Sequence, residues 1–189
     1  MGLGGFGELL VSSTAVQLAS HASCPLVVIR PRAAGVQPSP GSASGRVVVG
    51  IDGSTASDDA VQFAFAEARL RGVGVTAVHA WEKPPYDVPP SHDPLPPYLV
   101  ADELATTESG LLAGLLGAWP SKYPDVDLRT EAVNGDPVEA LVTRSPGATM
   151  LVVGSRGHGG FSSLLLGSIS HGVLHHARCP VVIIRHPAP

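Results

Sequence analysis

The chain has 189 residues, of which 44% are hydrophobic, and a formal net charge of −4. This length fits one full domain with a smaller piece beside it. Only two lysines, Lys83 and Lys122, are present, so the chain has no basic stripe that could neutralise a nucleic-acid backbone. No apolar run approaches the ~18 residues of a membrane span. Glu8, with no basic residue before it, argues against a signal peptide. We therefore predict a cytoplasmic protein that binds neither nucleic acid nor membranes.

The N-terminal segment of the chain is similar in sequence to the C-terminal segment. Residues 1–30 align without a gap onto residues 156–185, with 14 of 30 positions identical. Such self-similarity marks a repeated structural unit. Because the first copy carries only the last helix and strand of a unit, we predict a remnant at 1–32 and one complete domain at 46–186. Residues 33–45, which are small, polar and proline-bearing, are predicted to be a linker.

The two cysteines, Cys24 and Cys179, occupy the same place in the two copies, just before a strand-like run. We expect each to act as a small buried apolar side chain with a reduced thiol. The residues leave a bridge between the two copies open as the alternative.

From Arg46 onward, short apolar runs alternate with helical patterns, which predicts a doubly wound parallel sheet covered on both faces. The proline-rich stretch 82–98 is expected to be an irregular surface loop rather than a lid or a partner-binding segment. Ser54 is expected to cap the first helix and Gly72 to end it. The five predicted strands are 46–52, 73–81, 127–133, 149–153 and 180–185, and the predicted helices are 54–72, 100–119, 137–144 and 168–177.

A glycine-rich segment follows the fourth predicted strand, with the spacing Gly154-x2-Gly157-x9-Gly167-Ser168. Ligands of such sheets bind beyond the carboxyl ends of the strands. Glycine lets backbone N–H groups approach an anion closely and allows positive φ. Gly167 and Ser168 open the next helix, whose free N–H groups favour a phosphate, and the hydroxyls of Ser168 and Ser170 can donate as well. We predict a phosphate cradle, with a flexible glycine loop as the alternative.

These motifs resemble the universal stress protein family, specifically its ATP-binding branch. The resemblance also rests on the opening VVVGIDGS, the VHAW that ends the second strand, the Gly135-Asp136-Pro137 turn and the closing HHARCPVVIIR. It covers residues 46–186 in order, and residues 1–30 as the tail of a preceding repeat, as in actinobacterial tandem members. It implies a Rossmann-like fold of the adenine nucleotide alpha hydrolase type and ATP, with or without Mg²⁺, across the strand ends. The residues implied to bind the nucleotide are Asp52, Gly53, Ala80, Val153, Gly154, Arg156, Gly157, Gly167, Ser168, Ile169 and Ser170.

The first copy departs from this pattern. Ser12 stands at the equivalent of Gly167, so the first copy cannot form a nucleotide site by itself. Either the start of the gene is placed too late, or the chain is a degenerate tandem. The resemblance implies that the last strand is a dimerisation edge. We therefore predict that Pro25–Arg30 pairs antiparallel with Val181–Arg185, within one chain or between two.

The candidate site is poor in positive charge. It lacks the lysine of the G-x4-G-K-[ST] loop, and Arg156 is the only cation of the glycine-rich segment. Because phosphoryl transfer depends on electrostatic stabilisation, we expect binding with at most a slow ATPase activity, and we assign no catalytic residue. His171 and His175 have a metal-compatible spacing, with His158 and His176 nearby in sequence. No acidic or cysteine ligand joins them, so we assign no metal site.

Two function classes remain. The first is an ATP-binding regulatory or stress-response module, and the second is a nucleotide-independent dimerisation or interaction module of the same family. The intact glycine spacing favours the first.

Overall fold

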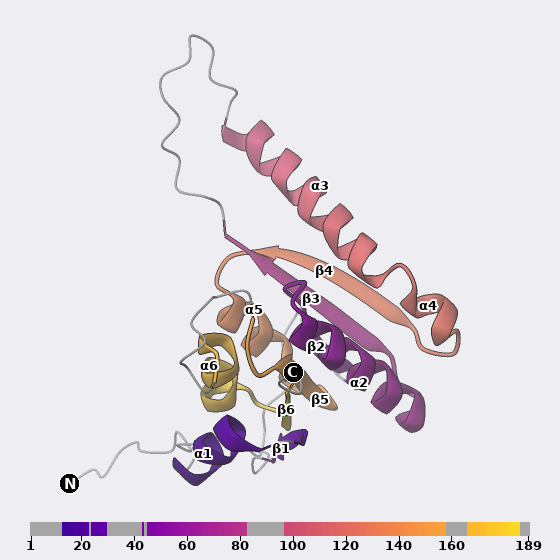
Figure 1. Cartoon of the computed structure of the whole chain (residues 1–189). Coiled ribbons are helices and arrows are strands. Elements are labelled where there is room, and N and C mark those ends of the chain that lie inside the picture. Colours follow the sequence, from indigo (N-terminus) through magenta and orange to yellow (C-terminus); the bar gives the residue numbers. More distant parts are fainter. Residues whose placement is uncertain are drawn as a thin grey trace, which may run out of the picture.

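The computed structural model describes residues 13–22, 24–29, 43, 45–82, 97–157 and 166–185, without the side chains of 13–15 and 97–102. These residues form one six-stranded sheet with the strand order β1-β6-β5-β2-β3-β4 (Figure 1). The strands are β1 (Leu26–Val28), β2 (Val47–Gly50), β3 (Val75–Trp81), β4 (Leu128–Asn134), β5 (Met150–Gly154) and β6 (Val181–Ile184). The helices are α1 (Ser13–His21), α2 (Thr55–Arg71), α3 (Pro97–Leu116), α4 (Trp119–Lys122), α5 (Pro137–Arg144) and α6 (Ser168–His176). Most of the predicted linker and of the predicted proline-rich loop lies outside the described residues.

Strands β2 to β6 run parallel, which confirms the predicted five-stranded parallel sheet. The chain builds outward from β2 through β3 to β4, and then continues on the other side of β2 with β5 and β6. The strand order therefore reverses between β2 and β5. Open α/β sheets bind ligands outside the carboxyl ends of the strands at such a reversal.

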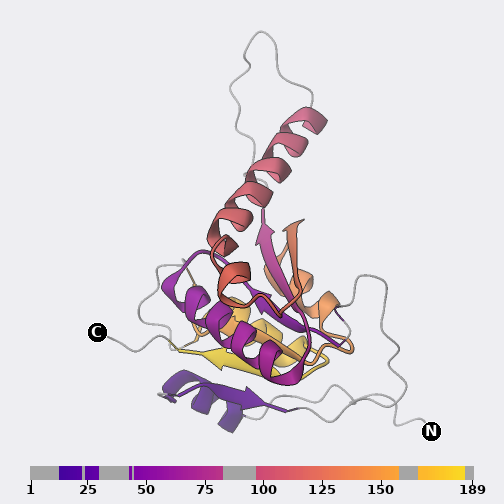
Figure 2. The same cartoon turned by 90° about the vertical axis from the view of Figure 1, so that its right-hand side faces the viewer.

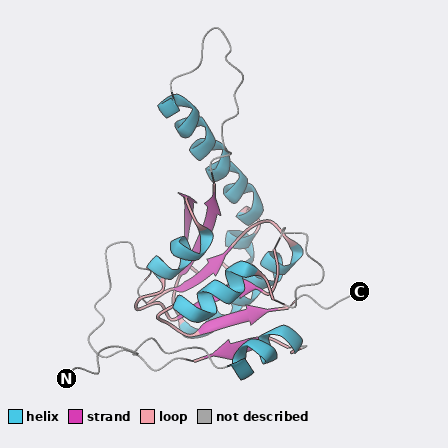
Figure 3. Ribbon diagram, turned by 90° about the vertical axis from the view of Figure 1, so that its left-hand side faces the viewer, coloured by secondary structure: helices cyan, strands magenta, loops and turns pink. Residues whose placement is uncertain are grey.

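Helices cover both faces of the sheet, as the doubly wound pattern predicts (Figure 3). Alternate residues of one strand face opposite layers: Val47 and Val49 pack with α2 and α3, whereas Val48 packs with α5 and α6. Strands β2, β5 and β6 are apolar on both sides because helices cover both of their faces, whereas the edge strand β4 carries polar, partly exposed side chains. None of the helices in the described part of the chain combines the length and apolar character of a membrane span.

Helix α2 has the predicted ends. The Ser54 hydroxyl accepts a hydrogen bond from the Ser57 N–H, and Gly72 follows the last turn in the left-handed conformation, with φ 64°. The single helix predicted over 100–119 is wrong at its end. Helix α3 stops at Leu116, and the short helix α4 follows. Pro120, which has no amide hydrogen to continue a helix, occupies the first turn of α4.

The elements of the N-terminal copy mirror those of the C-terminal copy. Helices α1 and α6 are nine residues long and begin at equivalent positions. Strand β1 pairs antiparallel with β6 of the same chain, with Leu26 opposite Ile183 and Val28 opposite Val181. Figure 2 shows β1 beside β6 at one edge of the sheet. The predicted antiparallel pairing is confirmed, and it adds a sixth strand to the five parallel ones.

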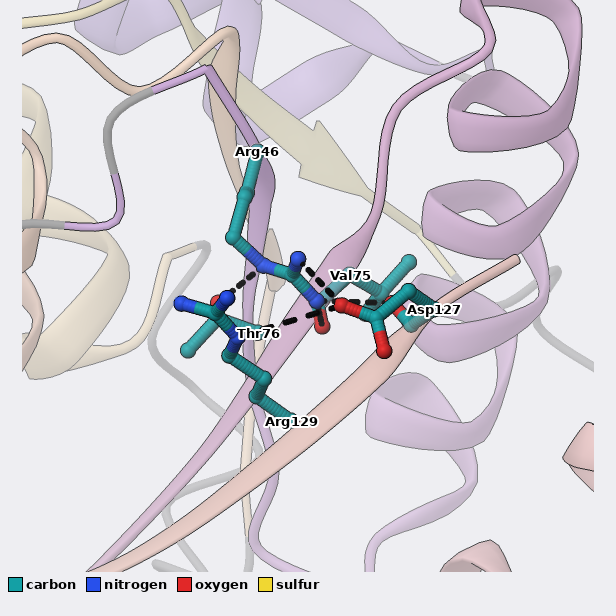
Figure 4. A network of polar contacts seen from close by, with 5 residues as sticks. All are labelled: Arg46, Val75, Thr76, Asp127 and Arg129. Atoms are coloured by element: carbon teal, nitrogen blue, oxygen red, sulfur yellow. Dashed lines mark hydrogen bonds and ion pairs between the residues drawn. The ribbon is translucent and has the colours of Figure 1, made fainter.

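Arg46 joins the amino ends of β2, β3 and β4 through one network of polar contacts (Figure 4). Arg46 Nη1 donates to the Asp127 carboxylate at 2.6 Å, and Nη2 donates to the carbonyls of Val75 and Asp127, both at 2.7 Å. Its Nε donates to the Thr76 hydroxyl at 3.0 Å. The guanidinium packs so closely on Gly74 that a Cβ there would lie 2.4 Å from Nη1. Only 11% of the Arg46 side chain is exposed, whereas its carboxylate partner Asp127 is 68% exposed, so the guanidinium that joins β2, β3 and β4 is shielded from solvent on all sides but that of Asp127.

Replacing this arginine should destabilise the fold. Arg46→Met is expected to lower the free energy of unfolding by about 1–3 kcal/mol, because the Val75 carbonyl and the Thr76 hydroxyl lose a charged donor, whereas the Asp127 carbonyl keeps the Val75 N–H. Urea denaturation measures the change. Arg129→Met is the matched control, since Arg129 is 66% exposed and lies 3.8 Å from Asp127; its effect should stay within about 0.5 kcal/mol. A loss of less than about 1 kcal/mol in Arg46→Met would contradict this role of the network.

The two cysteines differ in exposure although they are equivalent in sequence. Both thiols are free, so the bridge left open above is absent. The prediction that both are buried is correct for Cys179 and wrong for Cys24. Cys179 packs in the core cluster with α6 and the sheet. Cys24 precedes the edge strand β1, and it belongs to neither described core cluster.

Thiol reactivity should report this difference. Burial raises the pKa of Cys179 to about 12, so at neutral pH its thiolate, the reactive form, is scarce. A disulfide reagent is expected to label Cys24 quickly in the native protein and Cys179 only after unfolding. The chromophore released by the wild type should correspond to one fast thiol in buffer and two thiols in denaturant. The control, Cys24→Ser, should show no fast thiol in buffer and one thiol in denaturant. Two fast thiols in the native protein would show that Cys179 is accessible.

Candidate functional site

Three backbone segments meet where the strand order reverses: the end of β2, the end of β5 and the first turn of α6. The N–H of Gly167 donates to the carbonyl of Ser155 at 2.8 Å, which fixes the start of α6 against the residue that follows β5. Ser155 in turn donates its N–H to Ile184 of β6 at 2.6 Å. These contacts hold α6 with its amino end at the carboxyl edge of the sheet.

Asp52 lies two residues beyond the end of β2 with its carboxylate held in place. Its Oδ1 accepts hydrogen bonds from the Ser54 N–H at 3.0 Å and from the Ser54 hydroxyl at 2.6 Å. Gly53 makes the intervening turn with φ 81°, a conformation that favours glycine. The other oxygen, Oδ2, faces the segment after β5, because a Cβ on Gly157 would lie 2.1 Å from it. Gly157 is therefore a glycine because the Asp52 carboxylate fills the place of a side chain.

The other two glycines of the predicted cradle also allow close approach. A Cβ on Gly154 would lie 3.0 Å from backbone atoms of Ala56, in the first turn of α2. A Cβ on Gly167 would lie 3.3 Å from the Ser155 carbonyl oxygen. Neither these two glycines nor Gly157 adopts positive φ, so the sequence argument from φ is wrong at all three. Tight packing between the strand ends and the helices is the reason for glycine there.

The amino end of α6 carries no side-chain cap. Gly167 is the N-cap residue, with φ −70° and ψ 156°, and no side chain hydrogen-bonds to the first turn from that position. Amide donors in the first turn of a helix lack intrahelical partners, and with the helix dipole they favour an anion. Ser168 is exposed at this end, whereas Ile169 packs against the core. Arg156 and Gly157 are exposed beside it.

Two of the predicted site residues lie inside the protein. Ser170 is 2% exposed, and its hydroxyl donates to the carbonyl of Gly154 at 2.6 Å. In this structure that hydroxyl clamps β5 to α6 instead of pointing toward a ligand. Val153 is 4% exposed in the core between the sheet and α5 and α6. Both residues therefore stabilise the end of β5 from inside the protein.

Ala80 reaches the same edge from the neighbouring strand. Gly50, the last residue of β2, pairs with Val78, and β3 continues beyond it to Trp81. Ala80 thus lies two residues past this pair on β3, as Asp52 does on the segment after β2. All eleven predicted residues belong to the carboxyl edge of β2, β3 and β5 or to the first turn of α6.

Comparison with known proteins identifies the chain. The model of the universal stress protein family matches residues 44–185. This chain belongs to the universal stress protein family. It is 40% identical over 184 residues to Universal stress protein Rv2005c of Mycobacterium tuberculosis, a match that covers 97% of this chain and 59% of that protein. This universal stress protein therefore spans less than two thirds of the length of that relative.

Solved structures show the same fold. Universal stress protein UspA from Lactobacillus plantarum superposes with a TM-score of 0.61 at 23% identity, covering 75% of this chain and 97% of that one. A universal stress protein in complex with cAMP superposes with a TM-score of 0.55 at 26% identity, covering 77% of this chain and 100% of that one.

One polar contact at the carboxyl edge of this universal stress protein was missed by the sequence analysis. The imidazole of His79 on β3 lies with Nδ1 2.8 Å from the carbonyl oxygen of Ile51 and Nε2 3.0 Å from a carboxylate oxygen of Glu108 on α3. A signal was present in the sequence. Glu108 interrupts the apolar spacing Leu104, Leu112, Leu116, the last two of which α3 buries. A carboxylate on that face needs a partner.

Two other motifs singled out by sequence lie outside the strand reversal. Asp136 of the Gly135-Asp136-Pro137 turn caps α5 by accepting the Glu139 N–H at 2.8 Å. The rings of His171 and His175 lie 4.6 Å apart on α6. Over the described ranges, no three metal-ligating side chains gather in one place. His158 lies outside the described residues.

Proposed function

We propose that this universal stress protein binds an adenine nucleotide, ATP, at the carboxyl ends of β2 and β5. The observation that carries the proposal is the convergence of the uncapped amino end of α6 with two strand ends at the reversal of strand order. Donors arranged in this way suit a phosphate. Support for the ligand class comes from the related structure in complex with cAMP, an adenine nucleotide.

Each end of the nucleotide has its own protein groups in this proposal. The backbone at Ala80 meets the adenine, and Asp52 contacts the nucleotide from the end of β2. Gly154 and Gly157 line the ribose and the phosphates, and their packing leaves room only for backbone. The amides of the first turn of α6, with the exposed hydroxyl of Ser168, hold the phosphates. Mg²⁺, where present, comes with the phosphates and neutralises part of their charge.

The site is suited to binding more than to turnover. Arg156 is the only cation within its glycine-rich segment, and it is exposed. A catalyst must stabilise the transition state of hydrolysis more than it stabilises bound ATP. One exposed guanidinium adds little stabilisation that is specific to the transition state. We therefore propose a regulatory module. Its turnover number for ATP hydrolysis should lie below the usual enzyme range of about 1–1000 per second.

The proposal is tested by titrating the protein with ATP, ADP, AMP and cAMP, while its melting temperature and the heat of binding are measured. ATP is expected to raise the melting temperature. Ser168→Ala should weaken ATP binding by about 1 kcal/mol, roughly fivefold, through the loss of one hydrogen bond. Ser109→Ala is the matched control, because that serine is exposed on α3 and its hydroxyl bonds within the helix. Affinity for ATP should be unchanged in the control.

A second candidate function is nucleotide-independent association; the observation behind it is that the edge of β6 accepts a strand of equivalent sequence, β1. It predicts that none of the four nucleotides changes the melting temperature. It also predicts that removing the paired edge alters assembly. A wild-type protein that responds to no nucleotide would replace the first proposal by this one.

A further inference from the structure

His79 connects three elements at the nucleotide edge. It belongs to β3, one residue before Ala80, and its side chain is 12% exposed. Nδ1 lies against the carbonyl of Ile51, the residue before Asp52, and Nε2 lies against Glu108 of α3. One ring therefore touches the segment that carries Asp52, the strand that carries Ala80, and the helix that covers them.

Both neighbours of this ring are acceptors. The Ile51 carbonyl accepts only, and an ionised carboxylate such as that of Glu108 also accepts only. A neutral imidazole has one N–H, so one of its nitrogens would turn a lone pair toward an oxygen. The imidazolium form has two N–H groups and satisfies both contacts at 2.8 and 3.0 Å.

Two other charged residues near His79 in the described part of the chain have partners of their own. On β4, His79 faces Ala132 in the strand register, and the neighbouring Glu131 forms an ion pair with Arg144 of α5. On the segment after β2, Asp52 binds Ser54 through Oδ1. Glu108 is thus the carboxylate that contacts the ring directly.

We propose that His79, charged and held by Glu108, is a positioning residue for the nucleotide site, so that ATP affinity falls when the ring loses its second proton. The inference rests on the proposed function. His79 acts through the backbone of its two neighbours. Ile51 precedes Asp52, and Ala80 makes the proposed contact with adenine. A neutral ring turns a lone pair toward one of the two acceptors. The repulsion then shifts the Ile51 segment, or the turn of α3 that carries Glu108, away from the arrangement that binds ATP.

Glu108→Gln separates the charge from the contact. The side-chain amide that this substitution introduces donates to Nε2 of a neutral ring while Nδ1–H still donates to Ile51, so the network no longer needs the second proton. ATP affinity is measured by equilibrium dialysis at about pH 5.5 and pH 8.5, on either side of the range in which imidazoles titrate. Between these values the wild type should lose about threefold to tenfold more affinity than Glu108→Gln. Comparison at equal pH cancels the protonation of ATP itself.

Glu103→Gln is the matched control, because Glu103 lies exposed on the same helix. It should keep the wild-type pH profile. His79→Asn is the second variant: its amide can reach one acceptor only, and it should bind with the weaker affinity of the wild type at high pH, at both pH values. Melting temperatures without nucleotide show that each variant folds.

The outcomes separate the two proposals. Equal pH profiles in the wild type and Glu108→Gln, with ATP bound, would overturn the role of His79 and leave the proposed function standing. Absence of ATP binding in folded wild-type protein at both pH values would overturn both. A Glu108→Gln variant that folds but loses affinity equally at both pH values would show that Glu108 acts independently of the His79 proton.

Discussion

Removing residues 1–36 is expected to make the protein self-associate strongly. The deletion takes away α1 and β1 and opens one whole edge of β6, whose four residues are buried in the intact chain. It also uncovers apolar side chains that pack against Ala19, which is 1% exposed. An apolar, uncharged strand edge is a template for pairing with another chain. The intact protein covers this edge with its own β1.

Light scattering across a range of protein concentrations measures the effect. ATP binding should persist, because Asp52, Gly157 and the first turn of α6 belong to the retained part. Leu18→Ser is the matched control, since Leu18 is 52% exposed on α1 and its replacement leaves the β1–β6 pairing in place. A truncated protein that stays monomeric and equally stable would show that α1 and β1 do not protect the edge.

Gly167→Val is expected to abolish ATP binding while the protein still folds. The φ of −70° and ψ of 156° at this position are those of extended backbone, which valine adopts readily. Its Cβ would lie 3.3 Å from the Ser155 oxygen and 3.8 Å from the Ser170 hydroxyl, in the gap between the β5 exit and the first turn of α6. The branched methyl groups would occupy the place where a phosphate approaches the amide donors.

Calorimetric titration with ATP measures this loss, and thermal melting without ATP checks the fold. Gly114→Val on α3 is the matched control, because a Cβ there meets nothing within 4 Å. The control should bind ATP as the wild type does. Unchanged ATP affinity in Gly167→Val would remove the amino end of α6 from the site.

Local chemistry made much of the fold predictable. Ser54 and Gly72 define the ends of α2 through contacts within a few residues, so the sequence alone indicates them. The pairing of β1 with β6 was predictable for a different reason, since the chain repeats itself and the resemblance to the family implies that the last strand is an edge.

The remaining features depend on contacts between distant segments. The His79–Glu108 contact joins residues 29 positions apart, and it exists only once α3 docks in one register on β3. The inward turn of the Ser170 hydroxyl depends on where β5 ends relative to α6. Gly157 lies at this edge, but its need for space comes from the Asp52 carboxylate in the segment after β2 and not from positive φ. Sequence periodicity can mark Glu108 as a polar residue on an apolar helix face, but it does not identify the distant partner of such a residue.

The register between β1 and β6 has a local twofold symmetry. Val27 and Val182 are equivalent positions in the two copies and lie opposite each other, so the axis passes between them. The flanking pairs, Leu26 with Ile183 and Val28 with Val181, exchange under the same rotation. A strand edge that matches its own equivalent in this way is self-complementary, and a self-complementary contact closes after two partners instead of growing into a fibre. Association through an uncovered β6 should therefore stop at a dimer with Val182 of both chains on the axis.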